Sequence, residues 1–393
     1  MATTEQEIQL EPLDTSDVDR WIGKPIGGGQ LKEPISVTDI RRWAQGMSNP
    51  NRLYYDEEFA KESVFGQIVA PQSFAVCCDV GHGATPAIQG KIPGSHMLFG
   101  GDEWWFFGPR IKPGDKIRVE RLAYDYKVTN TKFAGPTMFQ RGDTTYINQN
   151  GEIIARQRST AIRYLVSNAV KLSSFQGQDK EPEWTEQELQ EIKAQKLAYY
   201  RTFFNHVIRR FDEVKTGEEL PVRVIGPHSA LTFATEWRSY IFTVWGSNYY
   251  DGLLTSTNEA GWLPEMSPVD PELAALDPSL ADGLYMGASR GHANPEYAKV
   301  IGMPRGYGYG ASMGAWVLDY VSNWSGELSY IVHSNVQYRN PALIGDVTFL
   351  RGKVQDKQKE VGGNTGIVVV EVEMSNQNGT VMAKGPVEVR FTI

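Results

Sequence analysis

Six histidines and two cysteines are the side chains of this chain best suited to acid–base, nucleophilic or metal chemistry. Five histidines are scattered and form no pair at helical spacing, so the sequence predicts no metal site; they are His82, His96, His206, His228 and His333. The sixth, His292, belongs to a segment that recurs in the chain. Cys77 and Cys78 are adjacent in an apolar run, where a thiol acts as a small hydrophobic group, so we expect neither a nucleophile nor a disulfide.

Two further runs are unusual in composition. Residues 306–310 read Gly-Tyr-Gly-Tyr-Gly, but no Gly-Lys-Ser/Thr follows them, so this is not a phosphate loop. Trp104 and Trp105 begin an aromatic run that either forms a wall of a binding site or packs between parts of the core. We expect residues 100–107, which include this aromatic run, to form a strand at an interface.

Composition and charge exclude several classes of protein. The formal net charge of −8 argues against a general nucleic-acid binder, which needs a basic surface. The hydrophobic fraction of 41% and charged fraction of 22% are typical of a globular protein. No apolar run approaches the ~18 residues of a membrane span, and the acidic start is unlike a secretory signal. We therefore expect a soluble, reduced, cytoplasmic protein with no membrane or nucleic-acid partner.

The chain repeats itself in three blocks that keep the same order. They pair residues 54–60 with 292–298, 109–115 with 341–346, and 148–156 with 376–384. The offset is 238 for the first block and 228 for the last, so it drifts only modestly and indicates a tandem duplication. In the last block, Asn150-Gly151 and Asn378-Gly379 lie between alternating apolar runs, which predicts hairpins with type I′ turns.

The order of elements in each copy predicts an α+β fold. Each copy reads as a lead-in, a helix, a loop, a second and more apolar helix, and then several long strands. The second helices are expected at 71–80 and 311–323. We expect two antiparallel sheets, each wrapping a central helix. The sheets should lie side by side and form one continuous surface, because pairing covers their exposed edges.

The boundaries follow from composition. We expect a tail at 1–21, an N-terminal domain at 22–176, a linker with a connecting helix at 177–213, and a C-terminal domain at 214–393. The connecting helix is expected over 186–210, where apolar residues recur without Pro or Gly. Residues 247–282, rich in Pro and Gly, are expected to form a long loop.

The repeated segments also carry a family resemblance. The first copy has residues 56–60 followed by Phe65-Gly66; the second has His292, then Pro295-Glu296-Tyr297-Ala298, Gly302, Pro341 and Gly345-Asp346. From about residue 22 to residue 393, the chain resembles the MaoC-like dehydratases and (R)-specific enoyl-CoA hydratases in a tandem (double) hotdog arrangement. The family motif reads Asp-x-Asn-Pro-x-His, and a Gly eighteen residues after the His donates its backbone N–H to the thioester oxygen.

Carried over residue by residue, the motif falls on the second copy. The resemblance places the catalytic base at His292 and the oxyanion-binding glycine at Gly310. The position of the motif Asp is Gly287, so that carboxylate is missing, and Ser289 and Arg290 replace Asn-Pro. In the first copy, Tyr54 and Gln72 stand at the His and Gly positions, although Asn49-Pro50 persists. The resemblance implies that the second copy does the chemistry and the first, degenerate copy shapes the acyl pocket.

Another acid must replace the missing Asp if the chain is an enzyme. Asp282 is the first candidate because it is close in sequence to Gly287, and Asp102, Glu103 and Glu296 are the others. The candidate substrate-binding residues are Ser289, Arg290, Tyr309, Arg339, Asn340, Trp104 and Trp105.

The resemblance implies a hydro-lyase that reversibly hydrates a 2-enoyl-CoA thioester or dehydrates its 3-hydroxyacyl form. It implies an acyl-CoA substrate, no cofactor and a homo-oligomer, a dimer or larger. Two alternatives stay open: a non-catalytic acyl-CoA-binding subunit of a hetero-oligomeric hydratase, and a different elimination or isomerisation on the same fold.

Overall fold

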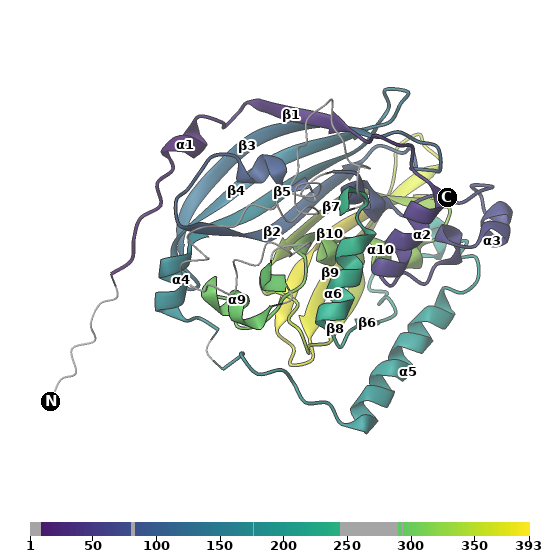
Figure 1. The fold of residues 1–393 in the computed structure, drawn as a ribbon. Helices are drawn as coiled ribbons and strands as arrows, with labels where there is room; N and C mark the ends of the chain where they lie inside the picture. The colour runs from purple at the N-terminus through teal and green to yellow at the C-terminus, as the bar shows by residue number, and fades with distance from the viewer. Residues whose placement is uncertain (1–8, 80–82, 176, 244–289, 293) are drawn as a thin grey trace.

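The computed structural model describes residues 9–79, 83–175, 177–243, 290–292 and 294–393, and its described strands form one ten-stranded antiparallel sheet (Figure 1). The first half contributes β1 (Pro25–Gln30), β2 (Ser95–Phe106), β3 (Arg118–Thr131), β4 (Gly135–Ile147) and β5 (Ile153–Leu165). The second contributes β6 (Arg223–Ile225), β7 (Ser329–Tyr338), β8 (Thr348–Lys359), β9 (Thr365–Asn376) and β10 (Val381–Thr392). The order β1-β3-β4-β5-β2-β7-β10-β9-β8-β6 reads the same from both edges, which confirms the doubled hotdog fold.

The helices repeat as well. The first half has α2 (Val37–Gly46), η1 (Arg52–Tyr54), α3 (Glu57–Glu62) and η2 (Gln72–Cys78). The second half has α6 (Ala230–Ser239), η9 (Arg290–His292), α9 (Pro295–Val300) and α10 (Gly310–Ser325) in the same order. The other helices among the described residues are α1 (Ser16–Asp19), η4 (Thr85–Ile88), α4 (Val166–Leu172), α5 (Glu186–Thr202), η5 (Phe211–Glu213) and η6 (Ile241–Thr243). In the part of the chain described, no helix is long and apolar enough to cross a membrane.

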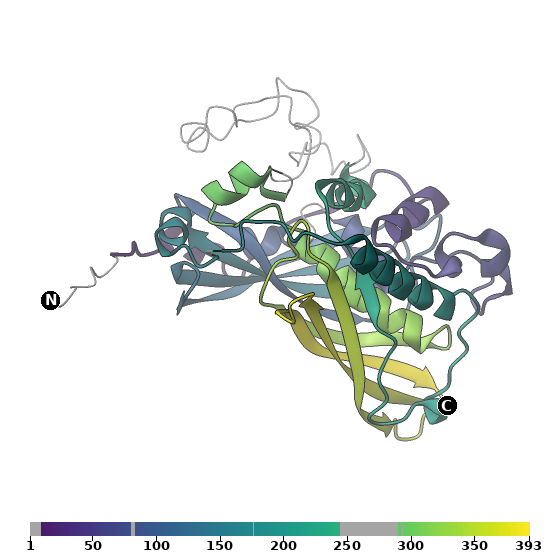
Figure 2. The same cartoon turned by 90° about the horizontal axis from the view of Figure 1, so that it is seen from below.

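Helix α10 forms the centre of the fold. It is almost entirely buried, including the polar side chains of Asp319 and Asn323, as expected of a helix enclosed by other elements. It packs on β2, β7, β8 and β10 and against η2, and Figure 2 shows it lying along the curved sheet. The helix expected at 311–323 is therefore present, and it extends from Gly310 to Ser325.

The matching helix of the first half differs from the expected one. Residues 71–80 were expected to form an apolar α-helix, but the structure has a 3-10 helix over Gln72–Cys78. Gln72 uses its side chain to bond the backbone of β7, as its Nε2 donates to Ile331 O and its Oε1 accepts from Ile331 N, both at 2.8 Å. These contacts hold the first turn against the neighbouring half.

The two halves join where β2 pairs with β7. The pairing runs from Gly101 opposite Gln337 to Trp105 opposite His333, so the expected interface strand lies at the junction, which we call the seam. A register shift between Phe99 and Gly101 accompanies the end of this pairing. The first residues of β2, Ser95–Phe99, therefore continue beyond the seam without β7 beside them.

The repeated hairpins differ from the expected turn type. Gly151 and Gly379 have positive φ, but Asn150 and Asn378 do not, so these are not type I′ turns. Instead, the Oδ1 of Asn148 accepts from the backbone N–H of Asn150 and of Glu152, each at 3.0 Å. Asn376 makes the matching pair in the second hairpin.

The connecting helix is shorter than expected. It was expected over 186–210, but α5 spans Glu186–Thr202 and lies at the periphery of the molecule (Figure 1). After it, Phe203 is buried in the core. The ring of His206 stacks on Phe59 with 3.7 Å between centroids, while its Nδ1 lies 2.6 Å from Glu327 Oε1. These contacts require the chain to leave the helical path after Thr202.

Candidate active site at the seam

A cavity of about 600 Å³ opens where β2 and β7 part. Its first-half wall is mainly apolar and includes Leu98, Phe99, Phe133, Phe139 and Ile162. Its second-half wall includes Trp237, His292, Met303, Tyr307, Gly310 and Tyr338. Because the two halves supply opposite walls, the cavity depends on the seam. Its size and apolar lining are typical of a small-molecule site.

His292 lies on this cavity with its ring held in place. It ends η9, is half-buried, and its Nδ1 lies 2.6 Å from the backbone carbonyl of Tyr307. The ring also packs against Tyr307 and Tyr309, with centroids 4.6 and 4.0 Å away. A carbonyl only accepts, so Nδ1 carries the hydrogen, and in the neutral ring Nε2 has the free lone pair of a base.

The surroundings of His292 favour its neutral form. Burial lowers its pKa to about 4; the bond to the Tyr307 carbonyl opposes this shift, and the positive charge of a protonated His96 adds to it. The imidazole is therefore a base with its lone pair available at neutral pH.

Gly310 begins α10 on the same cavity. It is the first helical residue after Tyr309, so its amide is among the first-turn N–H groups that find no acceptor inside the helix. A Cβ on Gly310 would overlap the Cβ of Phe99 on β2, so only glycine allows this close approach. The helix dipole adds positive potential here, which suits a developing oxyanion.

The equivalent place in the first half is closed. At offset 238 from His292 and Gly310 stand Tyr54 and Gln72, which line a space of only about 10 Å³. Tyr54 is buried, and burial raises its pKa to about 12. The Gln72 side chain bonds Ile331 in the strand that would otherwise border an opening. Bulk at these two positions fills the space that His292 and Gly310 leave open.

Comparisons with known proteins bear on the fold and on the family that the chain resembles. The family model "FAS1-like, dehydratase domain region" matches residues 20–157. A relative from Thermomonospora curvata, "Probable enoyl-CoA hydratase alpha subunit", is 28% identical over 158 residues, which are 37% of this chain and 50% of that protein. A solved "MaoC-like dehydratase" superposes with a TM-score of 0.59 at 15% identity, covering 96% of this chain and 99% of its own. The chain has the doubled hotdog fold of the MaoC-like dehydratases.

A second solved MaoC structure supports the fold. The putative MaoC domain protein dehydratase from Chloroflexus aurantiacus superposes with a TM-score of 0.52 at 11% identity, covering 96% of this chain and 97% of its own. At such identities the likeness shows the doubled hotdog fold. The chain spans about half the length of the curated relative from Thermomonospora curvata.

The structure brings together only some of the expected site residues. Tyr309, Arg339 and Asn340 line the cavity with His292 and Gly310. Arg339 is exposed, whereas Asn340 donates from Nδ2 to the Val381 carbonyl at 2.7 Å. Arg290 lies in η9 beside His292. Asp282, Ser289, Gly287 and the loop at 247–282 fall outside the described residues.

Trp104 and Trp105 do not line this cavity. Trp104 is buried and stacks on Phe106 and Tyr146, with centroids 5.4 and 5.7 Å away. Trp105 stacks on His333, 5.5 Å away. Neither lines the cavity, because both lie in the paired part of β2, past the register shift.

The other candidate carboxylates do not line the cavity either. Asp102 is buried and accepts hydrogen bonds from Gln157 Nε2 at 2.7 Å and from Tyr338 OH at 3.1 Å, and burial raises its pKa to about 7. Its link to the cavity therefore passes through Tyr338. Glu296 is exposed and pairs with Lys299 at 3.1 Å.

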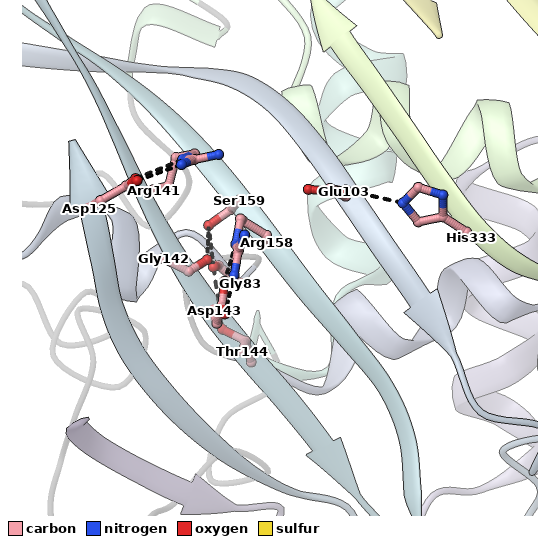
Figure 3. Close-up of polar contacts among 10 residues, drawn as sticks. All are labelled: Gly83, Glu103, Asp125, Arg141, Gly142, Asp143, Thr144, Arg158, Ser159 and His333. Atoms are coloured by element: carbon pink, nitrogen blue, oxygen red, sulfur yellow. Dashed lines mark hydrogen bonds and ion pairs between the residues drawn. The ribbon is translucent and has the colours of Figure 1, made fainter. Parts of the chain in front are cut away.

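Glu103 belongs to a set of polar contacts between neighbouring strands. Its Oε1 lies 3.1 Å from His333 Nε2 across the seam (Figure 3). In the first half, Arg141 pairs with Asp125 and Arg158 with Asp143, each with a contact of 2.7 Å. These pairs tie neighbouring strands together and leave the cavity to other residues.

Two polar residues of the cavity, Tyr307 and His96, were not predicted from the sequence as site residues. Tyr307 holds His292 through its carbonyl, and its hydroxyl lies 3.5 Å from His96 Nε2. The one sequence signal for His96 was its place just before residues 100–107, the run that was expected to be a strand at an interface. Among the described residues, no group of three or more His, Cys, Asp or Glu side chains could hold a metal ion.

Proposed function

We propose that this chain is a hydro-lyase that reversibly adds water to a 2-enoyl-CoA thioester. One observation carries this proposal: His292 and the N-terminus of α10 at Gly310 line the same apolar cavity. The Nδ1 of His292 is bonded to a carbonyl, which leaves its Nε2 available as a base. Hydration needs both a base for water and donors for the enolate oxygen.

The proposed reaction assigns a step to each group. The thioester carbonyl faces the Gly310 amide, and the acyl chain lies in the cavity against the apolar wall that includes Phe99 and Phe133. Neutral His292 takes a proton from water as the oxygen bonds C3. The electron pair of the double bond moves onto the thioester oxygen, where the helix N-terminus stabilises it. A proton then reaches C2 to complete the 3-hydroxyacyl product.

Two cations support the choice of a CoA thioester. Lys132 and Arg339 line the cavity and are exposed, so their side chains reach solvent at its rim. One comes from each half. Ammonium and guanidinium groups at the mouth of an apolar cavity suit the phosphates of CoA.

A second candidate is an acyl-CoA-binding subunit that acts with a catalytic partner. The name of the Thermomonospora curvata relative includes "alpha subunit", and Gly287 stands where the family has its Asp. The cavity would then bind the acyl group while the partner supplies the acid.

One assay separates the two candidates. The purified chain is mixed with crotonyl-CoA and with the longer 2-decenoyl-CoA, and loss of the conjugated thioester absorbance is followed while binding is measured by calorimetry. We expect hydration of at least one substrate. Binding without hydration of either would overturn the hydro-lyase proposal and support the subunit.

A further inference from the structure

A second histidine of the cavity comes from the opposite half of the chain. His96 lies on β2 among the residues that continue past the seam, and it lines the same cavity as His292. The two residues are 196 positions apart in sequence. The His292 segment belongs to the second half, so the doubled fold brings one imidazole from each half to one site.

Tyr307 bridges these two imidazoles. Its backbone carbonyl accepts from His292 Nδ1 at 2.6 Å, and its hydroxyl lies 3.5 Å from His96 Nε2. Tyr307 is itself buried, so one fixed residue sets the positions of both rings.

His96 also contacts a residue of its own half of the chain. Its ring meets the edge of Tyr164 on β5 with 6.0 Å between centroids. The Tyr164 hydroxyl in turn donates to the Ile301 carbonyl at 2.7 Å, which ties this wall to the second half. The charge of a protonated His96 acts on His292, which places the two groups within electrostatic reach.

The proposed reaction needs an acid to protonate C2, and no acid has been assigned so far. This arrangement of residues can supply one. Gly287 provides no carboxylate at the motif position, and Asp102 reaches the cavity only through the Tyr338 hydroxyl. Histidine can donate a proton near neutral pH, and it does so to a reacting group only when it borders the substrate. His96 meets that condition because it lines the cavity.

We propose that His96 is the second acid–base residue of this site and delivers the proton to C2 of the enoyl thioester, with Tyr307 as the positioning residue. This inference rests on the proposed function. His292 takes one proton from water as the C3–O bond forms, and His96 gives one proton to C2 as the enolate collapses. The proton on His292 is then released to solvent and His96 is reprotonated, so the net change is addition of one water.

The test replaces His96 while keeping its shape. In H96Q the Gln Nε2 can occupy the place of the imidazole Nε2 and keep the contact with Tyr307, but it cannot exchange protons. We expect kcat for hydration of 2-enoyl-CoA to fall about 10²–10⁴-fold, with the thioester Kd within about threefold of wild type. H333Q is the matched control, since His333 lies on the seam outside the cavity, and its kcat should stay within about twofold.

Each outcome decides between the proposals. An H96Q enzyme whose kcat stays within about threefold of wild type overturns this inference alone. A wild type that hydrates no enoyl-CoA overturns the proposed function and this inference with it. If H96Q does not fold, Y307F carries the test, because it removes the hydroxyl that faces His96 and keeps the carbonyl that holds His292. Its kcat should fall at least about tenfold, and a loss below about twofold overturns the role of His96.

Discussion

At the scale of single residues, the surroundings of His292 set both the pKa of its ring and the nitrogen that carries the hydrogen. Burial disfavours its charged form, and the Tyr307 carbonyl fixes which nitrogen carries the hydrogen. A lowered pKa keeps the base available at neutral pH but also makes it a weaker base. In the proposed reaction, the amide of Gly310 would offset that weakness by stabilising the charge that develops on the thioester oxygen.

The pH dependence of hydration should report this shift. Because the pKa of His292 is lowered to about 4, we expect the acid limb of the kcat/KM profile, where activity rises with pH, to have its midpoint near about 4. An ordinary histidine would give a rise near about 6.5. The unfolded chain takes up this proton first as the pH falls, so the same shift makes the fold less stable below about pH 6.5. A titration of kcat/KM, with circular dichroism as the control for folding, would contradict the account if the midpoint lay near 6.5.

At the scale of elements, the equivalent helices α10 and η2 differ in what lies beside their first residues. A cavity lies beside the start of α10, whereas the space beside the start of η2 is filled. Gly310 lets α10 approach β2 at Phe99 and leaves the cavity beside it. Gln72 closes the equivalent place in the first half by bonding Ile331. The difference between a cavity and a filled interface thus depends on the side chain at the start of each central helix.

Adding one methyl group at Gly310 tests this close approach. In G310A the new Cβ overlaps Phe99, so α10 or β2 must shift. We expect kcat/KM to fall at least about tenfold, and stability to fall by about 1–3 kcal/mol in urea unfolding. G363A is the matched control, because the nearest atom to its added Cβ lies at 3.5 Å. Equal activities of G310A and G363A would remove the close approach from the account.

At the scale of the whole molecule, the seam makes the site a shared product of both halves. The apolar wall and His96 come from the first half, while His292 and Gly310 come from the second. The β2–β7 pairing is the junction between two five-strand sets of one sheet. Separating the halves would expose both strand edges and open the cavity.

Expression of the halves as separate chains, cut near Lys180, tests this dependence. We expect each half alone to be insoluble or to associate, because unpaired edge strands bind other strands. Co-expression should restore a soluble pair that binds enoyl-CoA. Two halves that are stable monomers on their own would contradict a cavity and a sheet built across the seam.

The sequence revealed the local part of this organisation. The family motif placed the candidate base at His292 and the candidate oxyanion glycine at Gly310, because a motif register needs only short-range spacing. It did not reveal that His96 meets Tyr307, since these residues are 211 positions apart and only the β2–β7 pairing brings them together. The helix type of Gln72–Cys78 was also missed, because bonds to the other half decide it.

The central claim is that His292 is the base of a hydratase site, and the H292N enzyme tests it most directly. Asn can keep the donor that bonds the Tyr307 carbonyl, as His292 Nδ1 does, but it lacks the basic Nε2. Measuring kcat for enoyl-CoA hydration and thioester Kd on the same preparations, we predict a fall in kcat of about 10²–10⁴ with Kd within about threefold. A kcat within about threefold of wild type would contradict the account.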